Sequence, residues 1–160
     1  MNAILGGWQT QGIWRFDDGQ PMGLSSNSSV QIPTWGAQQP NLSGNLKRNT
    51  SSETSMVAQY FSNPEVASLP APYTLGNAPR LLNVFAPGTK NANLSVFKEF
   101  PLKKLLGEEG RLQFRIETFN ALNHVQFGYP NTTVGSGSFG LVTYQANSAR
   151  LVQIAAKVYW

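Results

Sequence analysis

The chain contains no cysteine, a single histidine and few charged residues. Asp, Glu, Lys and Arg make up 12% of its 160 residues, about half the charged share of a typical soluble globular protein. Without cysteine, neither a disulfide framework nor thiol chemistry can form. The net charge of +4 comes from scattered Lys and Arg, and because no basic stripe is present we expect no nucleic-acid partner.

Long apolar runs are missing as well. No segment approaches the roughly 18 consecutive apolar residues of a membrane-spanning helix. Residues 1–8 lack the charged start, apolar core and cleavage site of a signal peptide. If the protein is exported, we expect its beginning to lie elsewhere and the chain to be a fragment. The abundant Gly, Pro, Asn and Ser favour strands and turns over helices.

Residues 150–160 carry the clearest positive signal. Successive side chains of a strand point to opposite faces, so one face of this segment is wholly apolar and the other mostly polar. An apolar face that ends on an aromatic residue is typical of a strand in an outer-membrane β-barrel. We expect this strand to be the signal that the barrel-assembly machinery recognises, or simply an interface anchor, through Trp160, Val158, Ala156, Ile154 and Val152.

Alternation of the same kind predicts four strands, at about residues 5–17, 91–100, 111–123 and 149–160. Each is close to the 9–11 residues that a tilted strand needs to cross a bilayer. Charged side chains of both signs on one face suit a watery lumen, because a dry core would require a buried partner for each. The residues expected to face the lumen are Arg111, Gln113, Arg115, Glu117, Gln153 and Lys157.

Two tryptophans and one lysine mark the expected membrane interfaces. Trp8 and Trp14 lie on one face of the first strand, where we expect them to belong to an aromatic girdle. Lys98 interrupts the apolar face of the second strand near one end. We expect its ammonium group to extend toward the lipid headgroups.

The connections alternate between long and short. Residues 18–90 and 124–148 are long and rich in Gly, Asn and Ser, whereas residues 101–110 form a short charged link. Barrels of the outer membrane have long extracellular loops and short periplasmic turns. The sequence therefore predicts an all-β fold: an antiparallel transmembrane β-barrel fragment, an up-and-down meander of the last four strands of a large barrel, with both long loops outside the cell.

Four blocks of the sequence also carry a family resemblance. Gly7-Trp8 followed by Asp18-Gly-Gln-Pro21 is similar to the "G-W…S-G-Q-P" of TonB-dependent outer-membrane receptors of the Oar-like type, which bear a carboxypeptidase-regulatory-like domain. Residues 91–100 resemble that family's "N-x-D-L-S-L-F-K-N-F", with Asn93 in place of Asp. Residues 112–128 resemble "L-Q-F-R-x-E-x-F-N-x-x-N-H-x-x-F-G". Phe139-Gly140 and the ending at Trp160 resemble "F-G…R-x-x-Q-x-x-x-K-x-x-F", with Trp replacing Phe.

The resemblance implies that residues 1–160 are the C-terminal segment of a receptor barrel of about 22 strands in the bacterial outer membrane. Its partners would be outer-membrane lipid, the remainder of the parent barrel, the barrel-assembly machinery, TonB only through a plug domain that this chain lacks, and an unknown ligand at the extracellular loops. Such a segment cannot close on itself, because the smallest such barrels have about eight strands.

Catalysis, cofactors and metal ions are not expected. His124 has no second histidine or cysteine with which to share a metal, so a hydrogen-bonded position at the rim of the sheet suits it better. Glu108-Glu109 and Asp17-Asp18 fit solvated or capped turns. The Gly-rich residues 135–140 lack the lysine and following helix of a phosphate-binding loop. The alternative functions are a secreted β-sandwich or lectin-like binding module and, more remotely, a hydrolase.

Overall fold

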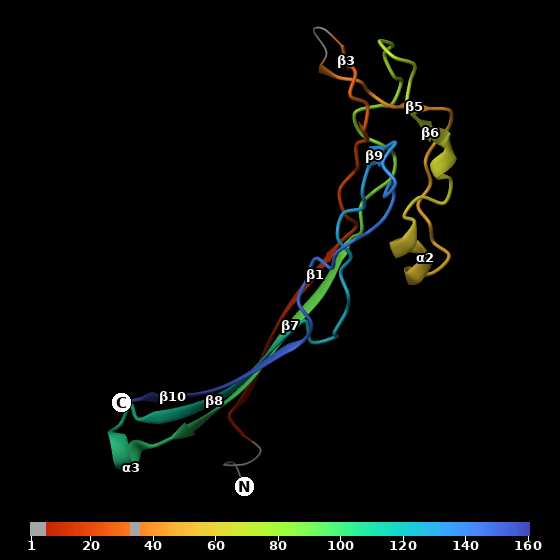
Figure 1. Cartoon of the computed structure of the whole chain (residues 1–160). Coiled ribbons are helices and arrows are strands. Elements are labelled where there is room, and N and C mark those ends of the chain that lie inside the picture. The colour runs from red at the N-terminus through yellow and green to blue at the C-terminus, as the bar shows by residue number, and fades with distance from the viewer. Residues whose placement is uncertain (1–5, 33–35) are drawn as a thin grey trace. The chain divides into compact units, whose positions relative to one another are not determined.

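A computed structural model describes residues 6–32 and 36–160, which fall into two units (Figure 1). We call them the strand unit, residues 6–16, 90–125 and 147–160, and the loop unit, residues 17–89 and 126–146. The strand unit contains the four long strands. The loop unit is built from the two connections that the sequence analysis places outside the membrane.

The strand unit is a sheet of four strands in the order β1-β7-β8-β10. Their bounds are Trp8–Asp17 for β1, Thr89–Pro101 for β7, Arg111–Phe119 for β8 and Leu151–Tyr159 for β10. The β7–β8 and β8–β10 pairs are antiparallel. Each of the last three strands therefore pairs with the long strand that comes before it in the sequence. The predicted up-and-down meander is confirmed.

The observed bounds of β7 and β10 differ from the expected 91–100 and 149–160 by one or two residues at each end. The predicted start of the first strand at Leu5 lies outside the described residues. The third strand stops at Phe119, short of the predicted end at Asn123, because the backbone turns left-handed at Asn120 and Asn123, both with φ 51°. Asparagine tolerates this conformation better than most residues, so the Asn-x-x-Asn spacing ends the strand.

The short link between β7 and β8 includes one helical turn, α3 (Lys103–Leu106). The amide of Leu102 donates to the carbonyl oxygen of Gly110 at 2.7 Å and closes the link. Gly107 follows α3 with φ 85°, which a residue with a Cβ rarely adopts. The link is as short as the sequence predicts.

The loop unit is a folded body with its own apolar core. Met22, Tyr60 and Phe61 are completely buried there. The remaining core residues come from distant parts of the two connections: Leu46, Met56, Leu82, Val84, Ala86 and Val142. The two predicted loops 18–90 and 124–148 thus fold together around one core. The sequence did not indicate this, because neither loop has a regular apolar period.

In the described part of the loop unit, residues 17–32, 36–89 and 126–146, the elements are short. Two residues of one connection pair with two of the other, β2 (Ser25–Ser26) in parallel with β9 (Thr133–Val134). The other elements are β3 (Gln31–Ile32), β4 (Gly36–Ala37), β5 (Asn41–Leu42), α2 (Glu53–Ala58), the 3-10 turn η1 (Pro64–Val66) and β6 (Ala67–Ser68). Frequent Pro and Gly keep these ladders short.

Tyr60 lies at the centre of this core. Its hydroxyl donates to the carbonyl oxygen of Phe85 at 2.6 Å, and its ring meets that of Phe61 edge-on at 5.7 Å between centroids. The guanidinium of Arg48 lies 5.6 Å from the centroid of the Tyr60 ring. Burial raises the pKa of the Tyr60 hydroxyl, although the positive charge of Arg48 opposes the rise. The hydroxyl is therefore held neutral as a hydrogen-bond donor.

Candidate functional site

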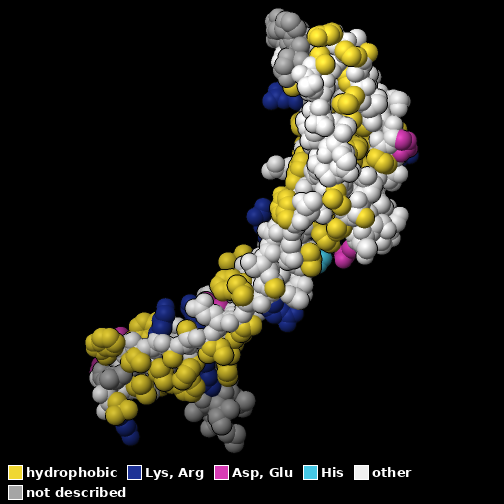
Figure 2. Space-filling model, in the orientation of Figure 1, with side chains coloured by type: hydrophobic (Ala, Val, Ile, Leu, Met, Phe, Trp, Pro, Cys, Tyr) yellow, Lys and Arg dark blue, Asp and Glu magenta, His cyan; other side chains and the backbone are white. Residues whose placement is uncertain are grey.

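The strand unit has one apolar face that is exposed. Residues directly opposite each other on neighbouring strands share a face, and Ile116 of β8 lies opposite both Ile154 of β10 and Val96 of β7. Ile154 is 75% exposed and Phe114 is 47% exposed. Figure 2 shows hydrophobic side chains gathered over the strands at the lower left of the view. A contiguous exposed apolar face marks a surface for lipid or for another protein.

Both tryptophans of the predicted girdle lie on this apolar face. The ammonium of Lys98, a residue of the same face, lies 4.8 Å from the centre of the Trp8 ring. A Cβ built on Gly12 would lie 3.1 Å from Trp14 Nε1 and 3.2 Å from a Leu94 methyl group, so Trp14 and Leu94 face the same way. Trp8 and Trp14 are each 56% exposed. Their position suits a girdle, which stays a prediction.

The opposite face of the sheet is polar. Residues 111, 113, 115 and 117 of β8 lie opposite residues 159, 157, 155 and 153 of β10. All six predicted lumen-facing residues are thereby brought together on one face: Lys157 lies opposite Gln113, and Gln153 lies opposite Glu117. That this face lines a lumen stays a prediction.

Hydrogen bonds and ion pairs cross the polar face. Gln113 Nε2 donates to Glu99 Oε1 at 2.9 Å, and Arg111 Nε lies 3.9 Å from Glu99 Oε2. Arg115 Nη1 donates to Glu117 Oε1 at 3.4 Å. The charges on this face are therefore largely compensated.

Two arginines of the polar face also stack on rings. The guanidinium of Arg111 lies 4.4 Å from the centre of the Tyr159 ring, and that of Arg115 lies 5.1 Å from the centre of the Phe97 ring. Glu99, Phe97 and Tyr159 were missing from the predicted lumen-facing set. The same alternation in residues 91–100 and 150–160 would have found them.

Some polar atoms on this face are buried without a hydrogen bond. They are Ser95 Oγ, Arg111 Nε, Gln113 Oε1 and Arg115 Nε. Residue 95 lies opposite residue 117, so all these side chains project from the same face. Buried polar atoms without partners are costly, so these atoms argue against a dry apolar core on this face.

A corner of asparagines ties β7, β8 and β10 together at one rim. The backbone amide of Asn120 donates to Asn93 Oδ1 at 3.0 Å. Asn120 Nδ2 donates to the carbonyl oxygens of His124 and Ser148, both at 3.1 Å, while its Oδ1 accepts from the amide of His124 at 2.9 Å. His124 takes part through its backbone, so the hydrogen-bonded rim position expected for it is confirmed.

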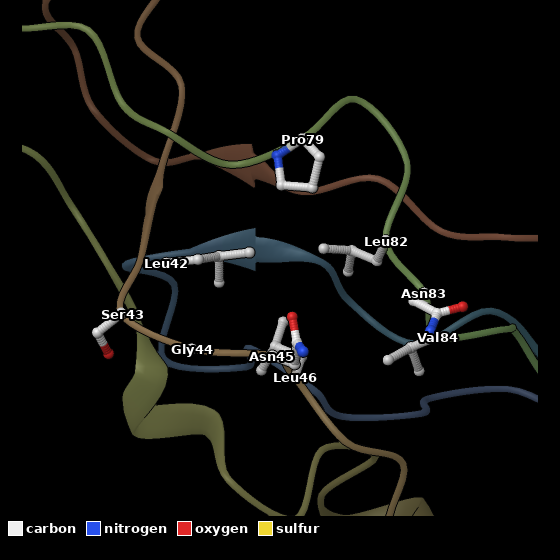
Figure 3. Close-up of a pocket in the computed structure, with 9 residues that line it drawn as sticks. All are labelled: Leu42, Ser43, Gly44, Asn45, Leu46, Pro79, Leu82, Asn83 and Val84. Carbon is white, nitrogen blue, oxygen red and sulfur yellow. The ribbon is translucent and has the colours of Figure 1, made fainter.

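The loop unit holds a pocket of about 280 Å³. In Figure 3, Pro79 and Leu82 approach it from one segment and Leu42 from another. Its floor includes the buried core residues Leu46 and Val84. The remaining lining residues are Ser43, Gly44, Asn45 and Asn83. The pocket is slightly smaller than typical small-molecule sites, and it could hold one small, largely apolar group.

Within residues 6–32 and 36–160, no group of three or more His, Asp or Glu side chains could hold a metal ion. Among the helices of the described part of the chain, none is long and apolar enough to span a membrane.

The two faces of β10 permit a matched test of their surroundings in the expected barrel. Ile154→Arg would place a charge on the apolar face, which should cost about 2–4 kcal/mol of folding stability near the middle of a bilayer. Gln153→Arg, one residue away, faces Glu117 and should cost almost nothing. The measurement is urea unfolding in vesicles, followed by the shift in electrophoretic mobility of folded barrels. Equal effects of both substitutions would contradict a lipid-facing Ile154.

The family model described as an outer membrane beta barrel domain matches residues 1–153. No curated protein and no solved structure matches the chain.

Proposed function

This chain belongs to the outer membrane beta barrel domain family and is located in the bacterial outer membrane, and from that premise we propose that it forms part of the wall of a TonB-dependent receptor. The receptor would bind or take up a large substrate. The observation that carries the proposal is the two-faced sheet: β7, β8 and β10 share an exposed apolar face and a hydrogen-bonded polar face. The four sequence blocks that resemble Oar-like receptors support the narrower assignment.

The lengths of the connections support an orientation. The short link through α3 would lie in the periplasm, and the loop unit would lie outside the cell, as in other barrels of this membrane. An extracellular loop unit would meet the ligand first. Its pocket at Leu42, Leu82 and Val84 is a candidate position for one small group of a larger ligand.

The edge strands of the sheet support the proposal that the chain has further partners. In the described residues, β1 pairs only with β7, and β10 pairs only with β8. An unpaired strand edge in lipid costs several kcal/mol for each unsatisfied group, so further strands of a parent barrel would cover both edges. TonB would act through a plug domain, and the barrel-assembly machinery would recognise β10. The proposed role includes no catalysis.

A secreted β-sandwich or lectin-like module is not favoured. It would need Leu112, Phe114, Ile154 and Val158 inside one shared core. Ile154 is 75% exposed, and Phe114 and Val158 are each 47% exposed. The outer-membrane location also argues against a secreted protein.

The size and location of the cellular product test the receptor proposal. Peptides from residues 6–160 should be found in the outer-membrane fraction, in a protein far larger than the 17.5 kDa of this chain. The same protein should yield peptides of a plug domain, and it should cross-link to TonB when the inner membrane is energised. A large barrel without plug peptides would overturn the assignment to TonB-dependent receptors.

A further inference from the structure

One end of the strand unit gathers cations, aromatic rings and exposed apolar side chains. Arg111 at the start of β8 lies opposite both Pro101 at the end of β7 and Tyr159 at the end of β10. The α3 link and Trp160, which is 86% exposed, therefore belong to the same end of the sheet. Trp8, at the start of β1, reaches Lys98 of β7 near this end.

Trp8 marks the level of the membrane surface, whereas Lys98 is only 5% exposed and does not extend toward the headgroups as the sequence suggested. Lys98 lies on the apolar face, where a charge is expensive unless it is close to the interface. Its ammonium lies 4.8 Å from the centre of the Trp8 ring and 5.1 Å from that of Phe100. Tryptophan on a lipid-facing surface concentrates at the headgroup level, and Trp8 is 56% exposed. The ring of Trp8 therefore places the edge of the acyl region just before the link.

The link directly beyond this level carries exposed cations. Lys103 and Lys104 of α3 are both exposed. Arg111 lies 3.9 Å from Glu99 and 4.0 Å from the exposed Glu109. The acidic residues of the link, Glu108 and Glu109, both follow Gly107 and lie outside the helical turn that carries the lysines. The two lysines thus present positive charge at the depth where lipid phosphates lie.

Leu105 of the same helical turn is 80% exposed. In water an exposed leucine gains nothing from burial, but at a membrane surface it can enter the boundary between headgroups and acyl chains. We propose that the α3 link is a binding site for anionic phospholipids, in which Lys103 and Lys104 bind the headgroup phosphates and Leu105 inserts beside them. This inference rests on the proposed membrane orientation of the strand unit.

Vesicle binding by the full chain tests the site. The chain, diluted from urea, is mixed with vesicles of phosphatidylcholine or of phosphatidylcholine with phosphatidylglycerol, and the bound fraction is measured by flotation. We expect binding to both, because the apolar face needs no charge. Anionic vesicles should bind about 30-fold more tightly, since each lysine near an anionic surface contributes about fivefold. High salt should abolish this preference.

The variants separate the site from general charge. Lys103→Gln with Lys104→Gln should remove the preference for anionic vesicles and leave binding to neutral vesicles unchanged. Lys47→Gln with Arg80→Gln removes the same charge from exposed positions of the loop unit and should keep the preference. Equal losses in both double variants, or a preference that survives in the first, would overturn the lipid site. Failure of the unaltered chain to bind either vesicle would instead overturn attachment of the strand unit to the membrane surface, which requires no closed barrel.

Discussion

Replacing Tyr60 with alanine should unfold the loop unit while the four strands stay in place. The side chain is completely buried, packs edge-on against Phe61 and donates to the carbonyl oxygen of Phe85 at 2.6 Å. Truncation of a buried aromatic side chain typically costs about 3–5 kcal/mol. Domains of ordinary stability have only about 5–15 kcal/mol in total, so this loss is a large part of what holds the unit together.

Protease added to intact cells that carry the complete barrel provides the measurement. The unaltered loop unit should resist cleavage, whereas the Tyr60→Ala unit should be cut within residues 36–89 and leave the membrane-embedded strands intact. Tyr60→Phe keeps the ring but leaves the Phe85 carbonyl without its donor, which should cost about 1–3 kcal/mol. The matched control is Tyr73→Ala, because Tyr73 belongs to the same unit and is 77% exposed.

Two outcomes would contradict the expectation. Resistance of Tyr60→Ala equal to that of the unaltered protein would mean that the core of the loop unit does not depend on this residue. Equal sensitivity of Tyr60→Ala and Tyr73→Ala would mean that the two connections are flexible loops, as their composition alone suggests.

The strands were predictable because their signal is local. In residues 111–117 each apolar side chain is followed by a polar one, and this period directly gives the two faces of β8. The faces of β10 could be inferred as well, because Gln153 and Lys157 alternate with the apolar residues Val152, Ile154 and Val158. Alternation does not predict the partners of a side chain, so the contact of Lys98 with Trp8 and Phe100 became visible only in the structure.

The loop unit was not predictable because its signals are not periodic. Its core joins Met22, Tyr60, Leu82 and Val142, which are far apart in the sequence and are not part of any regular repeat. Helix α2 was also missed, since six residues are too few for a helical period. The signal that could have found it is its cap, where the Ser52 side chain accepts from the amide of Ser55 at 3.1 Å.

Replacing Trp160 with alanine should strongly reduce assembly of the complete barrel into the outer membrane. The side chain is 86% exposed, so its removal costs the chain little packing. A large loss would therefore reflect something outside the chain that contacts Trp160. The two candidates are the barrel-assembly machinery, which would read the aromatic at the end of β10, and the membrane interface, which would only hold it.

Three variants distinguish the two candidates in a pulse-chase measurement of the rate at which heat-modifiable barrel appears. Trp160→Phe keeps an aromatic ring and should assemble at the normal rate. Trp14→Ala removes a tryptophan that is also half-exposed on the apolar face, so it measures the loss of an interface anchor. If recognition is the role of Trp160, Trp160→Ala should be much slower than Trp14→Ala. Equal rates for these two would assign Trp160 to anchoring, and normal insertion and abundance of Trp160→Ala would eliminate the recognition role.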